Sequence, residues 1–154
     1  MTAKKRTRSQ AGKLARNKGR AFEQLVARKL REIWPEAKRG YQARGGTAEA
    51  PDIQGTPFYI ECKHGAGATA WRGAWRQAFD ANPTSDLIPI AICRETGRRD
   101  VFVVMPALTA ACIDAGIFSN GLVGQEGYHR ELPMLVRMGF EEFLANAGAV
   151  GWPS

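Results

Sequence analysis

Two short motifs in the first half of the chain place carboxylates and a lysine at spacings that suit phosphodiester chemistry. Glu61 and Lys63 are two residues apart in a run that predicts a strand, so their side chains point to the same face of a sheet. Ile60 and Cys62 then point to the opposite, apolar face. Asp52 precedes Glu61 with eight residues between them, and a hairpin across that gap would bring the two carboxylates together.

Two carboxylates held close together repel each other unless a cation lies between them. Oxygen ligands favour a hard ion, so Asp52 and Glu61 predict a magnesium site, in which manganese would substitute. The ion would polarise a scissile phosphate and lower the pKa of a water molecule. Lys63 is placed to orient that water or to offset charge in the transition state. A fourth residue of interest, Glu23, lies upstream in a helical pattern.

Each of these residues alone also has a simpler interpretation. A Glu-x-Lys pair on the wet face of a strand forms ordinary ion pairs, and Pro51-Asp52 is a common turn dipeptide. Glu23 fits a solvated helix face, or a pair with Arg20 or Arg28. The combination of Asp52 with Glu61 and Lys63, across a turn cluster, favours a catalytic site.

Hydrophobic periodicity and turn residues predict the elements that would position this set. Residues 1–12 read as a flexible basic arm, and a helix is predicted from about Lys13 until Trp34-Pro35 stops it. Residues 36–50 form a basic, glycine-bearing connection, with a strand around Gly40–Ala43. The β signals at 51–53 and 58–63 enclose the turn cluster at 54–57.

The rest of the chain continues the alternation of helices and strands. A helix is predicted over 70–81, a β-hairpin over 88–105, and a short helix over 106–115. A glycine-rich loop over 117–133 precedes a last strand at 135–138 and a last helix at 141–147. The predicted fold class is α/β (mixed α+β), with a central mixed sheet flanked by helices.

The positive charge of the chain is concentrated at its N-terminus. The net charge is +7, yet the first twenty residues carry +8 and the remaining residues carry −1. Such a segment suits contacts with phosphates, since neutralising phosphates releases counterions. A solvated tail or a membrane-surface tether would have the same charge, but no amphipathic apolar stripe accompanies it. The basic residues of this segment are Lys4, Lys5, Arg6, Arg8, Lys13, Arg16, Lys18 and Arg20.

Length and composition narrow the class of protein further. A chain of 154 residues with 44% hydrophobic residues favours one domain, expected over residues 13–154. The sequence contains neither a transmembrane-length apolar run nor the apolar region of a secretory signal. Three widely spaced cysteines, Cys62, Cys93 and Cys112, argue against a disulfide framework or a zinc site, and we expect a cytoplasmic protein.

Four motifs taken together resemble the archaeal-type Holliday junction resolvases, a family of the PD-(D/E)XK nuclease superfamily. They span residues 17–63 most strongly and extend to about residue 105: Gly19-x-x-x-Glu23, Arg44-Gly45-Gly46-Thr47, Pro51-Asp52 and Glu61-Cys62-Lys63. The resemblance implies the superfamily's restriction-endonuclease-like core. It also implies a magnesium-dependent endonuclease that resolves four-way DNA junctions as a homodimer, with a role in DNA recombination and repair.

The resemblance also implies roles for individual residues. Glu23, Asp52 and Glu61 would bind the metal, with the backbone carbonyl of Cys62 as a further ligand, and Lys63 would be the catalytic lysine. Arg44 would touch the DNA backbone near the cleaved bond. Thr47 stands where the family often has a serine, which keeps a hydroxyl group at this position.

The helix predicted after Lys63 adds three candidates for DNA contacts. Arg72 and Arg76 are four residues apart and share one face, and Gln77 stands where many such nucleases bring a glutamine near the active site. An amphipathic helix with a wet polar side is the simpler alternative. Trp71 and Trp75 could stack on bases, but we expect them to pack in the core or at a dimer interface.

The sequence therefore predicts a metal-dependent endonuclease that cuts branched DNA by paired, symmetric nicks. Another PD-(D/E)XK nuclease, of restriction or repair type, is the alternative within enzymes. A basic nucleic-acid-binding protein without catalysis is the alternative outside them, although a pure binder has no need of carboxylates that repel phosphates.

Overall fold

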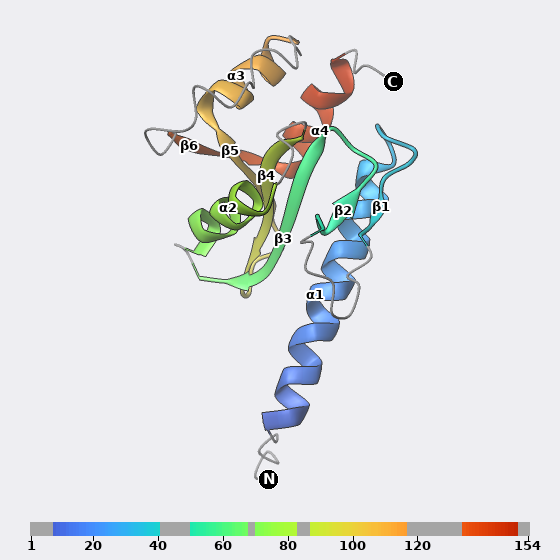
Figure 1. The fold of residues 1–154 in the computed structure, drawn as a ribbon, viewed down its shortest axis with the longest axis vertical. Helices are drawn as coiled ribbons and strands as arrows, with labels where there is room; N and C mark the ends of the chain where they lie inside the picture. The colour runs from blue at the N-terminus through green and yellow to red at the C-terminus, as the bar shows by residue number, and fades with distance from the viewer. Residues whose placement is uncertain (1–7, 41–49, 68–69, 83–86, 117–133, 151–154) are drawn as a thin grey trace.

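The computed structural model describes residues 8–40, 50–67, 70–82, 87–116 and 134–150. Within these ranges, four helices pack on one six-stranded mixed sheet (Figure 1), so the predicted mixed α/β class is confirmed. The helices are α1 (Arg8–Leu30), α2 (Ala70–Ala81), α3 (Ala107–Asp114) and α4 (Phe140–Ala149). The strands are β1 (Lys38–Arg39), β2 (Ile53–Gln54), β3 (Phe58–Ala66), β4 (Ile88–Glu95), β5 (Val101–Pro106) and β6 (Leu135–Gly139).

The strands lie in the sheet in the order in which they occur in the chain. Only β3 and β4 pair in parallel, and every other neighbouring pair is antiparallel. A parallel pair needs a crossover connection, and α2 supplies it between β3 and β4. The long strand β3 is therefore held on both sides, by β4 along its length and by β2 near its start.

Helices cover both faces of the sheet. One face packs against α1, α3 and α4, with Ile60, Ile92 and Val103 among the buried sheet residues. The opposite face packs against α2, whose Trp75 is 1% exposed and donates a hydrogen bond from Nε1 to the carbonyl oxygen of Pro89 at 3.0 Å. Trp75 thus belongs to the core, one of the two places expected for it.

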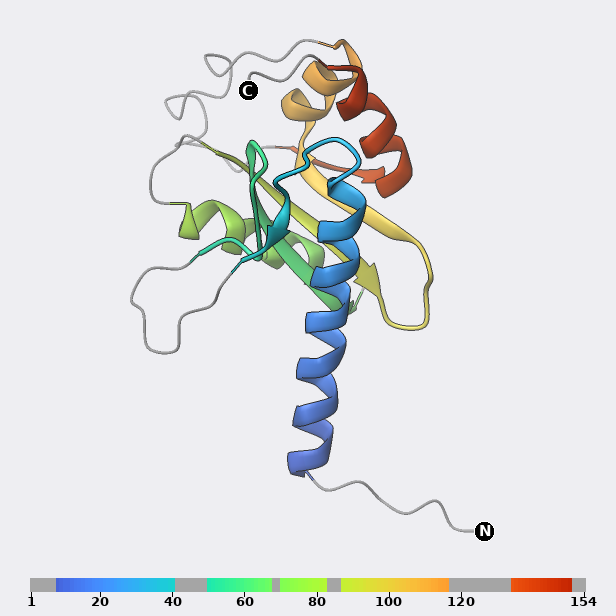
Figure 2. The ribbon, with the colours of Figure 1, turned by 90° about the vertical axis from the view of Figure 1, so that its right-hand side faces the viewer.

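The first helix is longer than its periodicity predicts. It begins at Arg8, so the expectation of a flexible arm is wrong for residues 8–12, while residues 1–7 lie outside the described part. Phe22, Val26 and Leu30 bury one face of its second half against the sheet. Once that half is docked, each further residue adds one hydrogen bond, and no proline precedes Lys13 to stop the helix. The first half therefore projects beyond the sheet (Figure 2).

The first strand lies earlier than the sequence predicts. β1 comprises Lys38 and Arg39, whereas the expected strand is centred on Gly40–Ala43, of which residues 41–43 lie outside the described part. Gly40 is not in the strand, but its N–H donates a hydrogen bond to the carbonyl oxygen of Asp52 at 2.7 Å. A Cβ on Gly40 would lie 2.0 Å from the carbonyl oxygen of Pro51, so this backbone approach requires glycine.

The remaining predicted elements are confirmed within a few residues of their expected ends. The helix over 70–81 is α2, the hairpin is β4–β5 with Gly97 at positive φ, and the short helix is α3. The last strand and helix are β6 and α4, and the expected loop over 117–133 lies outside the described residues. None of the helices in the described ranges is long and apolar enough to cross a membrane.

Replacing Gly40 with alanine should destabilise the fold by about 1–3 kcal/mol, the usual cost of forcing atoms into a packed position. The new Cβ would collide with the backbone of Pro51, which cannot swing away as a flexible side chain can. Gly73→Ala is the control, because a Cβ there meets nothing within 4 Å and alanine should stabilise α2 by about 0.5–1 kcal/mol. Urea denaturation measures both, and a Gly40→Ala protein as stable as wild type would contradict the close approach.

Candidate functional site

Asp52 is fixed to strand β3 by both its backbone and its side chain. Its N–H donates to the carbonyl oxygen of Ile60 at 2.9 Å, which extends the antiparallel pairing of β2 with β3. Its Oδ2 accepts a hydrogen bond from the N–H of Cys62 at 2.8 Å, and the residue is only 7% exposed. The hairpin expected between Asp52 and Glu61 is therefore present, with its turn at Gly55 in a positive-φ conformation.

Glu61 and Lys63 lie on the face of the sheet that α2 covers, as their spacing predicts. Glu61 is half-buried and Lys63 is exposed. Both charges act on the thiol of Cys93, which packs with α2; burial raises the pKa of this thiol to about 12, and among the nearby charges Lys63 lowers it and Glu61 raises it. Ile60 and Cys62 pack into the core on the opposite face.

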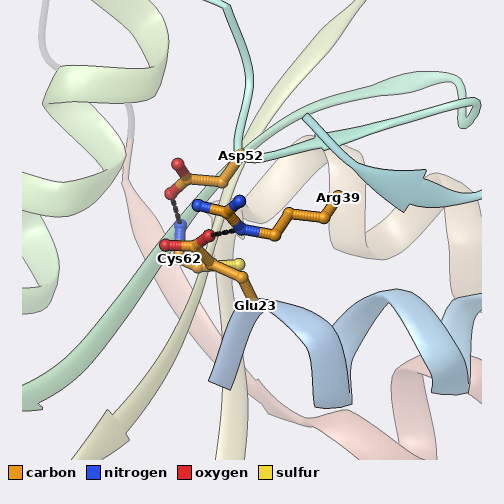
Figure 3. A network of polar contacts seen from close by, with 4 residues as sticks. All are labelled: Glu23, Arg39, Asp52 and Cys62. Carbon is orange, nitrogen blue, oxygen red and sulfur yellow. Dashed lines mark hydrogen bonds and ion pairs between the residues drawn. The ribbon is translucent and has the colours of Figure 1, made fainter. Parts of the chain in front are cut away.

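Glu23 reaches the same part of the sheet from α1, but it is not available as a free carboxylate. Its Oε2 accepts a hydrogen bond from Nε of Arg39 and forms an ion pair with it. The Glu23 side chain is 15% exposed and the Arg39 side chain 32% exposed. Figure 3 shows the Glu23 carboxylate joined to the guanidinium group of Arg39 and the Asp52 carboxylate joined to the backbone N–H of Cys62.

Three carboxylates act electrostatically on Cys62 in β3. Burial raises the pKa of the Cys62 thiol well above its usual value, and the negative charges of Asp52, Glu23 and Glu61 raise it further. Figure 3 shows Glu23 and Asp52 beside Cys62, whereas Glu61 lies on the other face of β3. The β2–β3 hairpin joins Asp52 to the strand of Glu61, whereas Glu23 is distant in the chain and only the packing of α1 brings it there.

The chemistry of these donors fits a hard divalent cation. All of the side-chain donors are carboxylate oxygens, and neither an imidazole nor a thiolate is needed among them. In the described part of the chain, however, no three His, Cys, Asp or Glu side chains are grouped closely enough to hold a metal ion. Glu23 instead has a cationic partner, Arg39. The ligand set of Glu23, Asp52, Glu61 and the Cys62 carbonyl therefore stays a prediction.

The residues expected to bind DNA differ in how the structure places them. Arg20 is exposed on α1, and Gln77 is exposed on α2. Arg76 is exposed and pairs with Asp80 at 3.0 Å. Arg72 lies 4.7 Å from the ring centre of Trp71 in a cation–π contact. Arg44 and Thr47 lie outside the described residues.

Arg39 is the residue that sequence reasoning missed. The one sequence feature that marks Arg39 is its position in the basic connection of residues 36–50, next to Lys38. Sixteen positions separate it from Glu23, a distance at which no periodicity links two residues. The pairing of β1 with β2 brings it to the carboxylates, because Arg39 is the register partner of Ile53, the residue after Asp52.

Comparison with known protein families, with curated proteins and with solved structures finds no match.

Asparagine and alanine at position 52 should separate the structural from the chemical role of Asp52. Asparagine keeps an oxygen that accepts the Cys62 N–H, so we expect its stability in chelator to stay within about 1 kcal/mol of wild type. Alanine leaves this N–H without that acceptor, which should cost about 1–3 kcal/mol. Denaturant titration measures both variants. Two equally stable variants would show that the hydrogen bond contributes nothing to the fold.

Proposed function

We propose that this protein is a metal-dependent endonuclease of the PD-(D/E)XK class that hydrolyses DNA phosphodiester bonds. The observation that carries the proposal is the attachment of Asp52 to the strand of Glu61 and Lys63. The buried carboxylate of Asp52 accepts a hydrogen bond from the N–H of Cys62, the residue that lies between Glu61 and Lys63 in β3. Stability alone does not require such an arrangement, since burying a carboxylate is costly.

Each residue then has a distinct task. Asp52 is held rigidly, because its Oδ2 accepts a hydrogen bond from the Cys62 N–H, and it supplies one carboxylate. Glu61, half-buried on the α2 face, supplies a second carboxylate. A bound magnesium ion would polarise the scissile phosphate and lower the pKa of the attacking water. Lys63 is exposed two residues further along the same face, where its ammonium group can approach that phosphate and offset its developing charge.

The projecting half of α1 supports DNA as the substrate. Lys13, Arg16, Lys18 and Arg20 are all exposed there, and the helix contains no acidic residue before Glu23. This cationic surface attracts a polyanion and leads along the helix to the carboxylates. The same surface would suit a nucleic-acid-binding protein that lacks catalysis, but for such a protein the buried carboxylate of Asp52 has no evident use.

Within this class, we propose a four-way junction as the preferred substrate and a homodimer as the active form. The chain contains one Asp52, Glu61 and Lys63 set, whereas junction resolution requires two nicks related by a two-fold axis. A two-fold symmetric dimer supplies two such sites, and this is the commonest assembly of soluble proteins. The motifs that resemble the archaeal-type resolvases support the same substrate. The three widely spaced cysteines favour the cytoplasm as the place of action.

With magnesium, the protein should cut a synthetic four-way junction by paired, symmetric nicks and cut a matching linear duplex far more slowly. Asp52→Asn, Glu61→Gln and Lys63→Ala should each lower turnover by roughly a hundredfold or more, because each removes one electrostatic stabiliser of the transition state. DNA binding should survive these changes. Gel analysis of end-labelled strands measures the rate and the nick positions.

The matched control for these variants is Glu142→Gln, which makes the same change at an exposed carboxylate on α4. It should leave cleavage unaltered. Excess chelator should abolish cleavage, and calcium should support binding without efficient cutting. Cleavage by Glu61→Gln at the wild-type rate would remove the proposed mechanism. Equal rates on junction and duplex would remove only the junction preference.

The basic half of α1 should contribute to the salt dependence of DNA binding. Each phosphate that the protein no longer neutralises should flatten the log–log slope of affinity against salt by about 0.9. Lys13→Gln with Arg16→Gln should therefore lower the slope by up to about two units. Arg72→Gln with Arg76→Gln should lower it less, because Arg76 already pairs with Asp80. Fluorescence anisotropy over a range of salt concentrations measures this slope. An unchanged slope for the α1 double variant would show that Lys13 and Arg16 do not contact the DNA phosphates.

A further inference from the structure

Arg137 is an exposed arginine of β6 whose guanidinium group lies against aromatic rings. Its guanidinium carbon is 3.7 Å from the ring centre of Phe102 and 6.0 Å from that of Trp71. Arg72 of α2 also contacts the Trp71 ring, at 4.7 Å. We propose that Arg72 and Arg137, the arginine pair at Trp71, bind phosphates of the DNA backbone next to the phosphate that is cut. This inference rests on DNA as the substrate of the proposed function.

The register of the sheet places Arg137 on the same face as Lys63. Lys63 is the register partner of Cys93, and Cys93 is the register partner of Phe102. Cys93 and Phe102 pack together with α2, so the three residues form one row across this face. Neighbouring strands are about 4.8 Å apart, which puts the Cα atoms of Lys63 and Phe102 about 10 Å from each other. DNA carries one phosphate charge per about 1.7 Å of its axis, so Lys63 and the cation over Phe102 can contact one duplex together.

The contacts of Arg137 orient its guanidinium group for a phosphate. Nη2 forms an ion pair with Oε1 of Glu95 at 3.4 Å, and 41% of the Arg137 side chain is exposed. A guanidinium group has several N–H donors in a planar fork, and one ion pair occupies only part of them. Stacking on Phe102 and pairing with Glu95 already restrict its rotamers, so Arg137 loses less conformational entropy when a phosphate binds.

The stability of the fold explains the positive charge at this position only in part. Exposed ion pairs such as that between Arg137 and Glu95 contribute little to stability. The contact with Phe102 needs a long side chain, and methionine would cover the ring without any charge. Within the described residues, Glu95 pairs with Arg137, whereas no ion pair neutralises Arg72. The arginine pair therefore keeps positive charge for a polyanion on the face that carries Lys63.

The salt dependence of binding to a labelled four-way junction, measured in chelator so that nothing is cut, tests this role. Arg137→Met keeps an apolar cover over Phe102 and removes the charge. It should weaken binding about tenfold, as expected for one lost hydrogen bond to a charged group, and flatten the log–log slope by about 0.9. Arg137→Lys should restore the slope but only part of the affinity, because it lacks the planar fork. Arg99→Met is the matched control, since Arg99 is exposed and lies beside Leu25 of α1, and it should change neither quantity.

Thermal unfolding and cleavage kinetics separate a contact with DNA from a structural role. Arg137→Met should melt within about 4 °C of wild type, because an exposed ion pair is worth little and its packing over Phe102 is kept. In magnesium, its KM for the junction should rise about tenfold with kcat nearly unchanged, the pattern of a residue that binds ground state and transition state alike. If Arg137→Met does not fold, Arg72→Met tests the same arginine pair from α2, with the same expected flattening of the slope.

The outcomes separate this inference from the proposed function. If wild type cuts the junction and folded Arg137→Met keeps the wild-type salt slope, the phosphate contact is overturned and the nuclease stands. Equal flattening by Arg99→Met would also overturn it, because the effect would then reflect net charge alone. If wild type cuts no DNA while Arg137→Met alone flattens the slope, the nuclease is rejected and the arginine pair stands as a DNA contact. If wild type does not bind DNA at any salt concentration, both are rejected.

Discussion

The buried carboxylate of Asp52, between the backbone of Gly40 and that of Ile60 in β3, constrains the residues around it. Asp52 is 7% exposed, and a charge in that position must be satisfied by donors and counter-charges from the protein itself. The N–H of Cys62 is one donor, and it lies on the strand that carries Glu61 and Lys63. The short strands β1 and β2, the turn at Gly55 and the close approach of Gly40 all hold this one side chain against β3.

The same constraint explains why α1 is attached where it is. Phe22 and Val26 anchor the helix in the core, and Figure 3 shows Glu23 of this helix next to Arg39 and Asp52. Arg39 then balances the added negative charge from β1. The elements α1, β1 and β3 are thus held together by the ion pair between Glu23 and Arg39 as well as by apolar packing. Helix, edge strand and central strand are consequently interdependent, and a change at one of them alters the electrostatics of the others.

Much of this fold can be predicted from the sequence because its signals are local. Alternation along Phe58–Lys63 and the turn at Gly55 predict the β2–β3 hairpin, and helical spacing with Asn82-Pro83 as a stop predicts α2. The start of α1 at Arg8 escapes prediction, since residues 8–12 show no apolar periodicity and are helical only because the helix continues from its docked half. The Glu23–Arg39 pair escapes prediction for a different reason. It depends on the register of β1, and a two-residue strand has too short a pattern to predict.

The continuity of α1 gives it a mechanical property. One unbroken helix runs from the exposed basic residues to Glu23, and Glu23 lies ten positions, or about 15 Å along the axis, from Lys13. A helix is stiff over this length, so a force on its free half tilts the half that is docked. Glu23 lies near the pivot, where the helix enters the core at Phe22. A force on the projecting half would therefore be transmitted along the helix to the ion pair between Glu23 and Arg39 at its base.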